Sequence, residues 1–351
     1  MSTATTTSRP RSGNSGEALL EVEDLTVRFG RATKHTEVFT AVDGVSFSVA
    51  PGQTVGLVGE SGCGKSVTSL AIMQLLPERG NTVTGSVRFE GTELTTLSGA
   101  EMRDKRGADL AMIFQDPLSS LNPVVSLGVQ VAEVLQRHRG MKKNAATKRA
   151  EELLDKVGIP DPTRRLDEYP HQLSGGMRQR ALISMALACE PRLLIADEPT
   201  TALDVTIQAQ ILALLKELVE ESGTALVMIT HDLGVVAGLC DEVNVLYAGR
   251  IVERGDRHPL FATPRHPYTG GLLESIPRLD EKRGSRLNPV PGSVADNIPW
   301  DHGCAFAPRC SSEVDACRER SPDLVQDDDV SDLRLLRCHH PLPTQHQTEE
   351  A

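Results

Sequence analysis

The sequence predicts an α/β fold in which helices cover both faces of a buried parallel sheet. Two observations predict it. Short apolar runs alternate with segments whose apolar residues recur about every 3.6 residues, and three of the runs lead into residues suited to phosphate or metal chemistry. Parallel sheets gather ligands at the carboxyl ends of their strands, so a binding site is expected along one sheet edge. The three runs are 54–58, 192–196 and 225–230.

The remaining elements follow in order along the chain. Two strands joined by a polar loop are expected at 19–29 and 41–49, and residues 242–254 indicate a hairpin turning at Ala248-Gly249. From about Phe261 the chain becomes irregular and rich in proline, so we expect a main domain over 18–262, an extension over 263–342 and a tail over 343–351. Helices are expected to begin at Lys65, Leu127, Ala146, Gly176 and Thr206.

Composition narrows the function. The chain has 351 residues, enough for one large domain and an appendage. Its 48 acidic and 37 basic residues give a net charge of −11, which argues against a protein that mainly neutralises nucleic-acid phosphates. No apolar run approaches the roughly 18 residues of a membrane-spanning helix, so any membrane role is expected to go through partners. Residues 1–17, rich in Ser and Thr, are expected to be a disordered tail and not a secretion signal, which favours a cytoplasmic location.

A phosphate-binding loop follows the strand at 54–58. It matches the pattern Gly-x-x-x-x-Gly-Lys-Ser/Thr between an apolar strand and an apolar helix. The glycines let backbone N–H groups face phosphate oxygens, Lys65 supplies a charge for the terminal phosphates, and the Ser66 hydroxyl is placed to ligate Mg²⁺. The residues expected to bind nucleotide are Gly59, Glu60, Ser61, Gly62, Cys63, Gly64, Lys65, Ser66 and Val67.

Four polar residues follow strands of the same predicted sheet. Asp197 is suited to hold Mg²⁺, and Glu198, one residue later, to accept a proton from the attacking water. His231 and Gln115 also come at strand ends, where they could contact the γ-phosphate, Mg²⁺ or that water. An isolated Asp-Glu pair is most often a solvated turn and a lone His is usually structural. The phosphate loop upstream favours the functional interpretation.

A second glycine motif lies between the loop and these acids. Residues 173–179 read Leu-Ser-Gly-Gly-Met-Arg-Gln. Ser174, Gly175 and Gly176 offer a hydroxyl, bare backbone N–H groups and a helix N-terminus, all of which suit phosphate. The chain has one such run and one phosphate loop.

The order of these motifs, with Ala202-Leu203-Asp204 before His231, resembles the ATP-binding cassette (ABC) ATPases over about residues 19–260. The resemblance implies a P-loop NTPase with a RecA-like core, an antiparallel β subdomain and a helical subdomain at about 117–188. It also implies that Ser174, Gly175, Gly176 and Asp204 serve an ATP held by a second subunit, and that Phe29 stacks on adenine, with Phe39 as a competitor.

Finer motifs resemble the peptide and nickel importer branch of this family. They are Phe114-Gln115-Asp116-Pro117, Ser119 to Pro123, Tyr169 to Gln172 and His266 to Thr269. The resemblance implies an ATPase subunit at the cytoplasmic face of the cell membrane that drives uptake of di- or oligopeptides. Its partners would be a homologous, non-identical second ATPase, two membrane permease subunits and an extracytoplasmic solute-binding protein, with no nucleic acid. A non-peptide solute such as nickel or oligosaccharide, and a soluble ABC ATPase acting on nucleic acid or ribosomes, are the alternatives.

Four cysteines crowd into 35 residues of the extension: Cys304, Cys310, Cys317 and Cys338. In a reducing compartment such a cluster favours a metal site over disulfides. Four thiolates suffice for a tetrahedral Zn²⁺ or a 4Fe-4S cluster, although the spacing lacks the C-x₂-C pairs usual for zinc. The family resemblance implies the iron–sulfur cluster, with zinc or unligated cysteines as alternatives.

Overall fold

The computed structural model describes residues 18–30, 38–201, 203–275, 290–294, 302–330 and 332–344. The expected N-terminal tail, Ala202 and residues 345–351 of the expected C-terminal tail lie outside the described residues. No helix within these ranges combines the length and apolarity needed to cross a bilayer.

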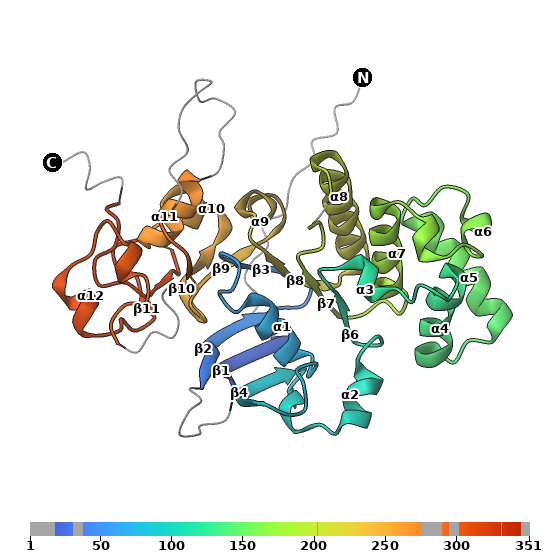
Figure 1. Ribbon diagram of the computed structural model, residues 1–351, viewed down its shortest axis with the longest axis horizontal. Helices are drawn as coiled ribbons and strands as arrows, with labels where there is room; N and C mark the ends of the chain where they lie inside the picture. The colour runs from blue at the N-terminus through green and yellow to red at the C-terminus, as the bar shows by residue number, and fades with distance from the viewer. Residues whose placement is uncertain are drawn as a thin grey trace, which may run out of the picture.

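An eight-stranded sheet forms the centre of the molecule (Figure 1). Its order is β11-β12-β10-β9-β3-β8-β7-β6, and the run from β9 to β6 is parallel. All residues of β3, β7 and β8 are buried, which explains why these strands read as uninterrupted apolar runs. The predicted parallel sheet is therefore confirmed. The parallel strands are β3 (Thr54–Val58), β6 (Leu110–Ile113), β7 (Leu193–Asp197), β8 (Ala225–Thr230) and β9 (Glu242–Tyr247).

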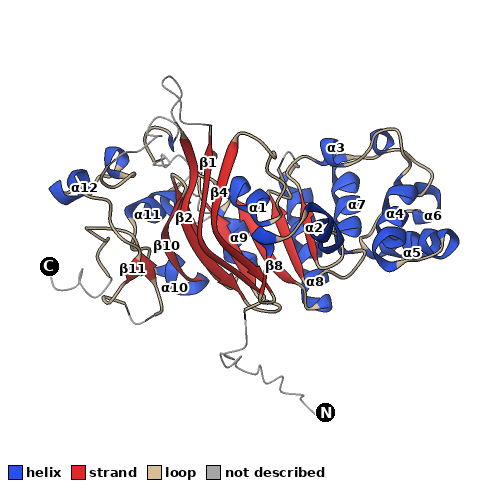
Figure 2. Cartoon of the chain, turned by 90° about the horizontal axis from the view of Figure 1, so that it is seen from below, coloured by secondary structure: helices blue, strands red, loops and turns tan. Residues whose placement is uncertain are grey.

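A separate antiparallel sheet packs beside the central one (Figure 2). Its order is β2-β1-β4-β5, and the helix α1 (Lys65–Ile72) contacts β1, β2 and β7, so it lies between the two sheets. This placement fixes the N-terminus of α1 against both sheets. The strands are β1 (Leu20–Phe29), β2 (Phe39–Val49), β4 (Asn81–Phe89) and β5 (Thr92–Glu93), followed by η1 (Leu94–Thr96) and α2 (Gly99–Lys105).

Helices form the opposite end of the molecule from the extension (Figure 1). They comprise α3 (Pro117–Ser120), α4 (Leu127–Arg139), α5 (Lys143–Lys156), α6 (Pro162–Arg165), η2 (Pro170–Gln172) and α7 (Gly175–Leu187); α8 (Val205–Ser222) and α9 (Leu233–Leu239) flank the central sheet. Lys65 and Leu127 begin helices as expected, and α7 and α8 begin one residue early. Helix α5 begins at Lys143 and not Ala146, because the residues before Ala146 are exposed and leave no apolar signal.

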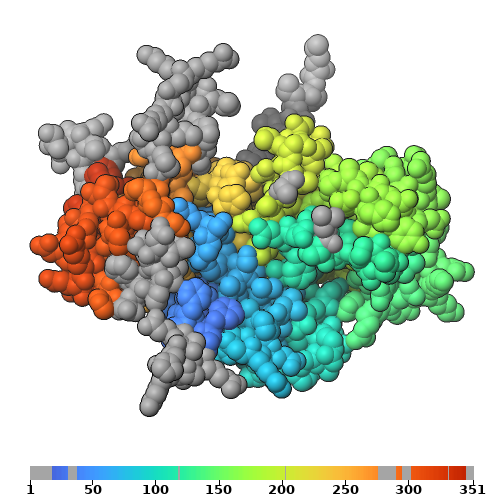
Figure 3. All heavy atoms as spheres, in the orientation of Figure 1, coloured from blue at the N-terminus to red at the C-terminus, as the bar shows by residue number. Residues whose placement is uncertain are grey.

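The extension is joined to the central sheet. After the hairpin of β9 and β10 (Arg250–Asp256), the short strand β12 (Leu335–Leu336) pairs with β10, and β11 (Val325–Gln326) pairs with β12. Figure 3 shows the extension against the side of the molecule. Helix α10 (Arg257–Ala262) precedes the extension, which contains α11 (Pro267–Glu274), η4 (Ala307–Arg309) and α12 (Asp315–Glu319). A region expected to be irregular thus adds two strands to the main sheet.

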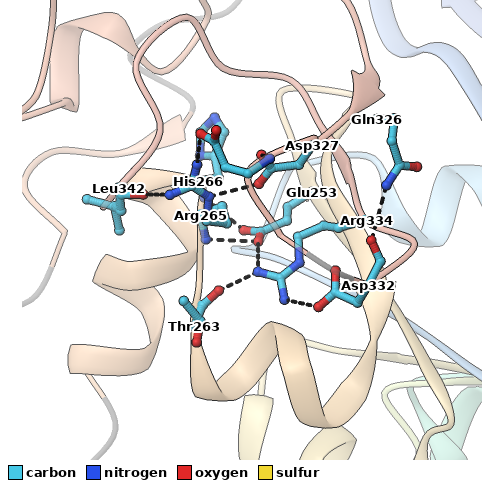
Figure 4. Close-up of polar contacts among 10 residues, drawn as sticks. Glu253, Thr263, Arg265, His266, Gln326, Asp327, Asp332, Arg334 and Leu342 are labelled. Atoms are coloured by element: carbon cyan, nitrogen blue, oxygen red, sulfur yellow. Dashed lines mark hydrogen bonds and ion pairs between the residues drawn. The ribbon is translucent and has the colours of Figure 1, made fainter. Parts of the chain in front are cut away.

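Buried charges fasten the extension to β10 (Figure 4). Glu253 of β10 is fully buried and accepts hydrogen bonds from the backbone amides of Arg265, at 2.9 Å, and His266, at 3.0 Å. Arg334, also buried, contacts the same carboxylate at 3.4 Å and Asp332 at 2.7 Å. Removing one member would leave a buried charge without its partner, which is costly.

Candidate nucleotide site

The phosphate loop joins β3 to α1 through backbone conformations that glycine tolerates. Gly59 has φ 153° and Gly64 has φ 102°. A Cβ at Gly59 would lie 2.3 Å from the carbonyl oxygen of Leu246, and one at Gly64 would lie 2.5 Å from that of Ala41. Both positions therefore require glycine for two reasons, the left-handed backbone and the close approach of another strand.

Lys65 lies at the first position of α1 and is 4% exposed. Its Nζ donates to the carbonyl oxygens of Gly59, at 2.7 Å, and Glu60, at 2.9 Å. The ammonium group is thus held at the mouth of the loop beside the positive end of α1.

A cavity of about 380 Å³ opens over the loop. It unites most of the expected nucleotide-binding residues with Gln115 and Glu198 from two different strand ends. Gly59, Glu60 and Cys63 are not among its lining residues: Cys63 is fully buried, and Glu60 donates its amide to Tyr268 Oη at 2.9 Å. The side chain of Glu60 faces the extension, and the contact expected between Glu60 and the nucleotide stays a prediction. The lining comprises Phe29, Phe39, Ala41, Ser61, Gly62, Gly64, Lys65, Ser66, Val67, Gln115 and Glu198.

Two aromatic rings lie at the wall of this cavity. Phe29 and Phe39 are direct partners across the β1–β2 ladder, and both line the cavity. Cross-strand neighbours lie about 5 Å apart, so both rings are near any base that enters. The stacking role of Phe29, with Phe39 as competitor, stays a prediction.

Asp197 and Ser66 form a site suited to Mg²⁺. The Ser66 hydroxyl donates to Asp197 Oδ1 at 3.0 Å, which joins the end of β7 to the start of α1. Burial raises the pKa of Asp197, although the Ser66 hydrogen bond opposes the rise. A divalent cation beside this carboxylate would offset the cost of keeping it charged.

Glu198 is held by three side chains from three segments. Gln115 Nε2 and Thr201 Oγ1 each donate to its Oε2 at 2.9 Å, and His231 Nδ1 donates to Oε1 at 3.2 Å. Burial raises the pKa of Glu198, but the hydrogen bonds from Thr201 and His231 and the charge of Lys65 outweigh it, so the pKa lies below its usual value. The carboxylate is therefore ionised at neutral pH and can accept a proton only from a strongly polarised water.

The structure brings together Gln115, Glu198 and His231, which the sequence placed at three strand ends. Glu198 adopts φ 46°, a left-handed conformation that is uncommon for residues other than glycine. Sequence reasoning missed Thr201, whose only signal was its position three residues after the acid.

The Ser-Gly-Gly run lies at the start of α7, and its residues are not among those that line the cavity over the phosphate loop. Ser174 caps the helix, its Oγ accepting from the amide of Met177 at 3.3 Å, while Gly175 and Gly176 form the first turn. A Cβ at Gly176 would lie 2.8 Å from Ile207 of α8, so glycine allows the two helices to approach. Asp204 caps α8 by accepting from the amide of Ile207 at 3.0 Å.

The four extension cysteines influence one another. Burial raises the pKa of Cys304, Cys310 and Cys338, the last to about 12, and repulsion from neighbouring cysteines raises each further. The pKa of Cys338 is raised by all three of the other cysteines, Cys317 included. Within the described ranges, no three His, Cys, Asp or Glu side chains are arranged to hold a single metal ion.

Comparison with known proteins agrees with this geometry. The ABC transporter family profile matches residues 42–201, and that of the oligopeptide/dipeptide transporter C-terminal region matches residues 252–317. The solved ATP-binding cassette MJ0796, a dimer bound to ADP and phosphate, superposes with a TM-score of 0.59 at 28% identity, covering 68% of this chain and 99% of that one. CbiO1 of Clostridium perfringens gives 0.58 at 26% identity, covering 70% and 92%.

Longer relatives cover the extension as well. The dipeptide transport ATP-binding protein DppD of Escherichia coli is 50% identical over 325 residues, which is 93% of this chain and 97% of the relative. DppD of Bacillus subtilis is 53% identical over 302 residues, 86% of this chain and 89% of the relative. The chain is therefore an ATPase and belongs to the ATP-binding subunits of ABC transporters of the oligopeptide/dipeptide class.

Proposed function

We propose that the chain hydrolyses ATP in the cavity over its phosphate loop and thereby drives uptake of di- or oligopeptides through a membrane complex. The observation that carries the proposal is that Gln115 and Glu198 line the same cavity as Lys65, with His231 hydrogen-bonded to Glu198. Such a cluster can bind a triphosphate and orient a water for in-line attack.

Each side chain has a role that its contacts support. Lys65, the loop amides and the N-terminus of α1 bind the phosphates, and Phe29 stacks on the base. Glu198 accepts the proton of the attacking water, while Gln115 and His231 hold its carboxylate and contact the water or the γ-phosphate. Ser66, Asp197 and Gln115 would hold Mg²⁺, which neutralises phosphate charge when bound.

Two cassettes complete each site. Ser174, Gly175, Gly176 and Asp204 do not line the cavity of their own chain, yet Ser174 and the first turn of α7 form an N-terminus suited to phosphate. A head-to-tail pair would bring this N-terminus to the ATP of the partner. Hydrolysis would then depend on association, as a transport motor requires.

The relatives support a set of membrane partners. Proteins named for dipeptide transport share about half of this sequence over nearly its whole length. A homologous second ATPase, two permeases and an extracytoplasmic binding protein would complete the complex, with this chain at the cytoplasmic face and the loop at 116–123 receiving a permease helix.

Transport by the purified complex, reconstituted in proteoliposomes, tests the proposal. ATP enclosed with the chain should drive accumulation of di- or oligopeptides, and Glu198→Gln should abolish it while ATP still binds. Accumulation of nickel or an oligosaccharide in place of peptides would refute the solute assignment. Hydrolysis stimulated by nucleic acid or ribosomes, without transport, would refute the importer itself.

We also propose that Cys304, Cys310, Cys317 and Cys338 bind a 4Fe-4S cluster, with Zn²⁺ as the alternative. The support is that burial and neighbouring cysteines raise the pKa of Cys304, Cys310 and Cys338, so a bound cation would be needed to keep these thiols as thiolates. The spacing of the four cysteines lacks the C-x₂-C pairs usual for zinc, which favours the cluster over Zn²⁺. Iron, sulfide and zinc analysis after anaerobic purification decides between them; a folded, metal-free extension would refute both.

A further inference from the structure

We propose that Arg309 of the extension is a positioning residue for the phosphate loop, acting through Glu60. The two residues are 249 positions apart, yet their side chains form a two-pronged ion pair: Nη1 to Oε2 at 2.6 Å and Nη2 to Oε1 at 2.9 Å. The inference rests on the nucleotide site proposed above and adds a residue from outside the cassette motifs.

Arg309 is held rigidly. Its side chain is 3% exposed, and its remaining donors are also engaged. Nε donates to the carbonyl oxygen of Pro291 at 2.6 Å, and Nη2 donates to those of Val290 and Gly292 at 3.3 and 3.2 Å. A planar guanidinium whose donors are all used presents a fixed fork to the carboxylate.

Aromatic packing from the same region fixes a second atom of the loop. Tyr268 of α11 accepts the amide hydrogen of Glu60 at 2.9 Å. Its ring lies 4.7 Å from that of Tyr247 and 5.3 Å from that of Phe306, three residues before Arg309. Both the side chain and the backbone of Glu60 are thus fixed by one packed unit of Tyr247, Tyr268, Phe306 and Arg309.

The ion pair has an electrostatic consequence at the nucleotide. Glu60 places a negative charge within a loop that must attract phosphates, and two like charges a few ångströms apart repel. Arg309 neutralises this charge and directs it away from the cavity, which Glu60 does not line. The carbonyl oxygen of Glu60 meanwhile accepts from Lys65 Nζ, so the position of Glu60 also sets that of the ammonium group.

ATP affinity of the full chain, titrated with a fluorescent ATP analogue and Mg²⁺, tests the proposal. Arg309→Gln should weaken binding about tenfold, because it leaves an unpaired carboxylate in the loop. Adding Glu60→Gln should restore affinity to within about threefold of wild type, since the repelling charge is then gone. Arg318→Gln is the matched control: Arg318 forms a similar pair with Glu313 at 2.6 Å in the same extension but is 77% exposed, and it should leave affinity unchanged.

Tyr268→Phe provides a test that does not depend on the folding of the arginine variant. It removes only the hydroxyl that accepts from Glu60 and keeps the ring packing, and it should weaken binding about threefold. Unchanged affinity in Arg309→Gln or in Tyr268→Phe would overturn the proposal, as would an Arg309→Gln defect that Glu60→Gln fails to repair. Lys65→Ala distinguishes a failure of the Arg309 proposal from a failure of the proposed nucleotide site. If Lys65→Ala binds ATP like wild type, the nucleotide site itself is wrong.

Discussion

Replacing Glu198 by glutamine isolates the proton-accepting role of this side chain. The carboxylate has two hydrogen bonds at Oε2, from Gln115 and Thr201, and one at Oε1, from His231. A glutamine oxygen placed at Oε2 keeps the first two, so the side chain stays in place and loses about one hydrogen bond, roughly 1 kcal/mol of stability. The chemical loss is larger, because an amide cannot accept the proton.

We expect kcat for ATP hydrolysis to fall about 10²- to 10⁴-fold in the assembled complex. ATP affinity should stay within about threefold of wild type, because the phosphate loop is unchanged. Phosphate release measures the first quantity and equilibrium titration the second. Glu190→Gln is the matched control, since Glu190 also has a positive φ, 48°, but is 70% exposed and outside the site. A kcat within tenfold of wild type would remove Glu198 from its role.

Three further predictions address the partner site, the loop and the extension. Ser174→Arg should leave ATP binding by the isolated chain intact but reduce hydrolysis by the assembled complex at least about tenfold; full activity of the complex would contradict the shared site. Gly64→Ala should lower the free energy of unfolding by about 1–3 kcal/mol, measured in urea, because φ is 102° and the new Cβ would lie 2.5 Å from the Ala41 oxygen; an unchanged midpoint would contradict this. Burial lowers the pKa of His266 to about 3, so as the pH falls this histidine takes up a proton in the unfolded chain before it does so in the folded one. The free energy of unfolding of wild type should therefore fall by up to about 1.4 kcal/mol per pH unit between about pH 6.5 and pH 3. His266→Asn keeps an acceptor that can cap the helix and should flatten this slope. If the free energy of unfolding of the variant falls with pH in parallel with that of wild type, His266 is not the group responsible.

The central sheet and its site could be predicted because their signals are local. Strands β3 and β8 occur at the expected residues, since burial on both faces makes each an unbroken apolar run. Glu198 and His231 follow such runs directly, so the topology of a parallel sheet suffices to bring them together.

The extension could not be predicted in the same way, because its contacts join residues far apart in sequence. Strands β11 and β12 have two residues each, too few for any periodicity, and their register depends on β10. The pairing of Arg309 with Glu60 likewise has no local signal, since it depends on how the aromatic residues of three segments pack.

The pairing of β12 with β10 makes the sheet continuous from the phosphate loop to the cysteine segment. Successive hydrogen-bonded ladders link β3 to β9, β9 to β10 and β10 to β12. Cys338 lies two residues beyond β12, so only three ladders separate the cysteine segment from the strand that precedes the phosphate loop. The sheet therefore forms one continuous hydrogen-bonded backbone path between the two regions of the chain that carry its distinctive chemistry, the phosphate loop and the cysteine cluster.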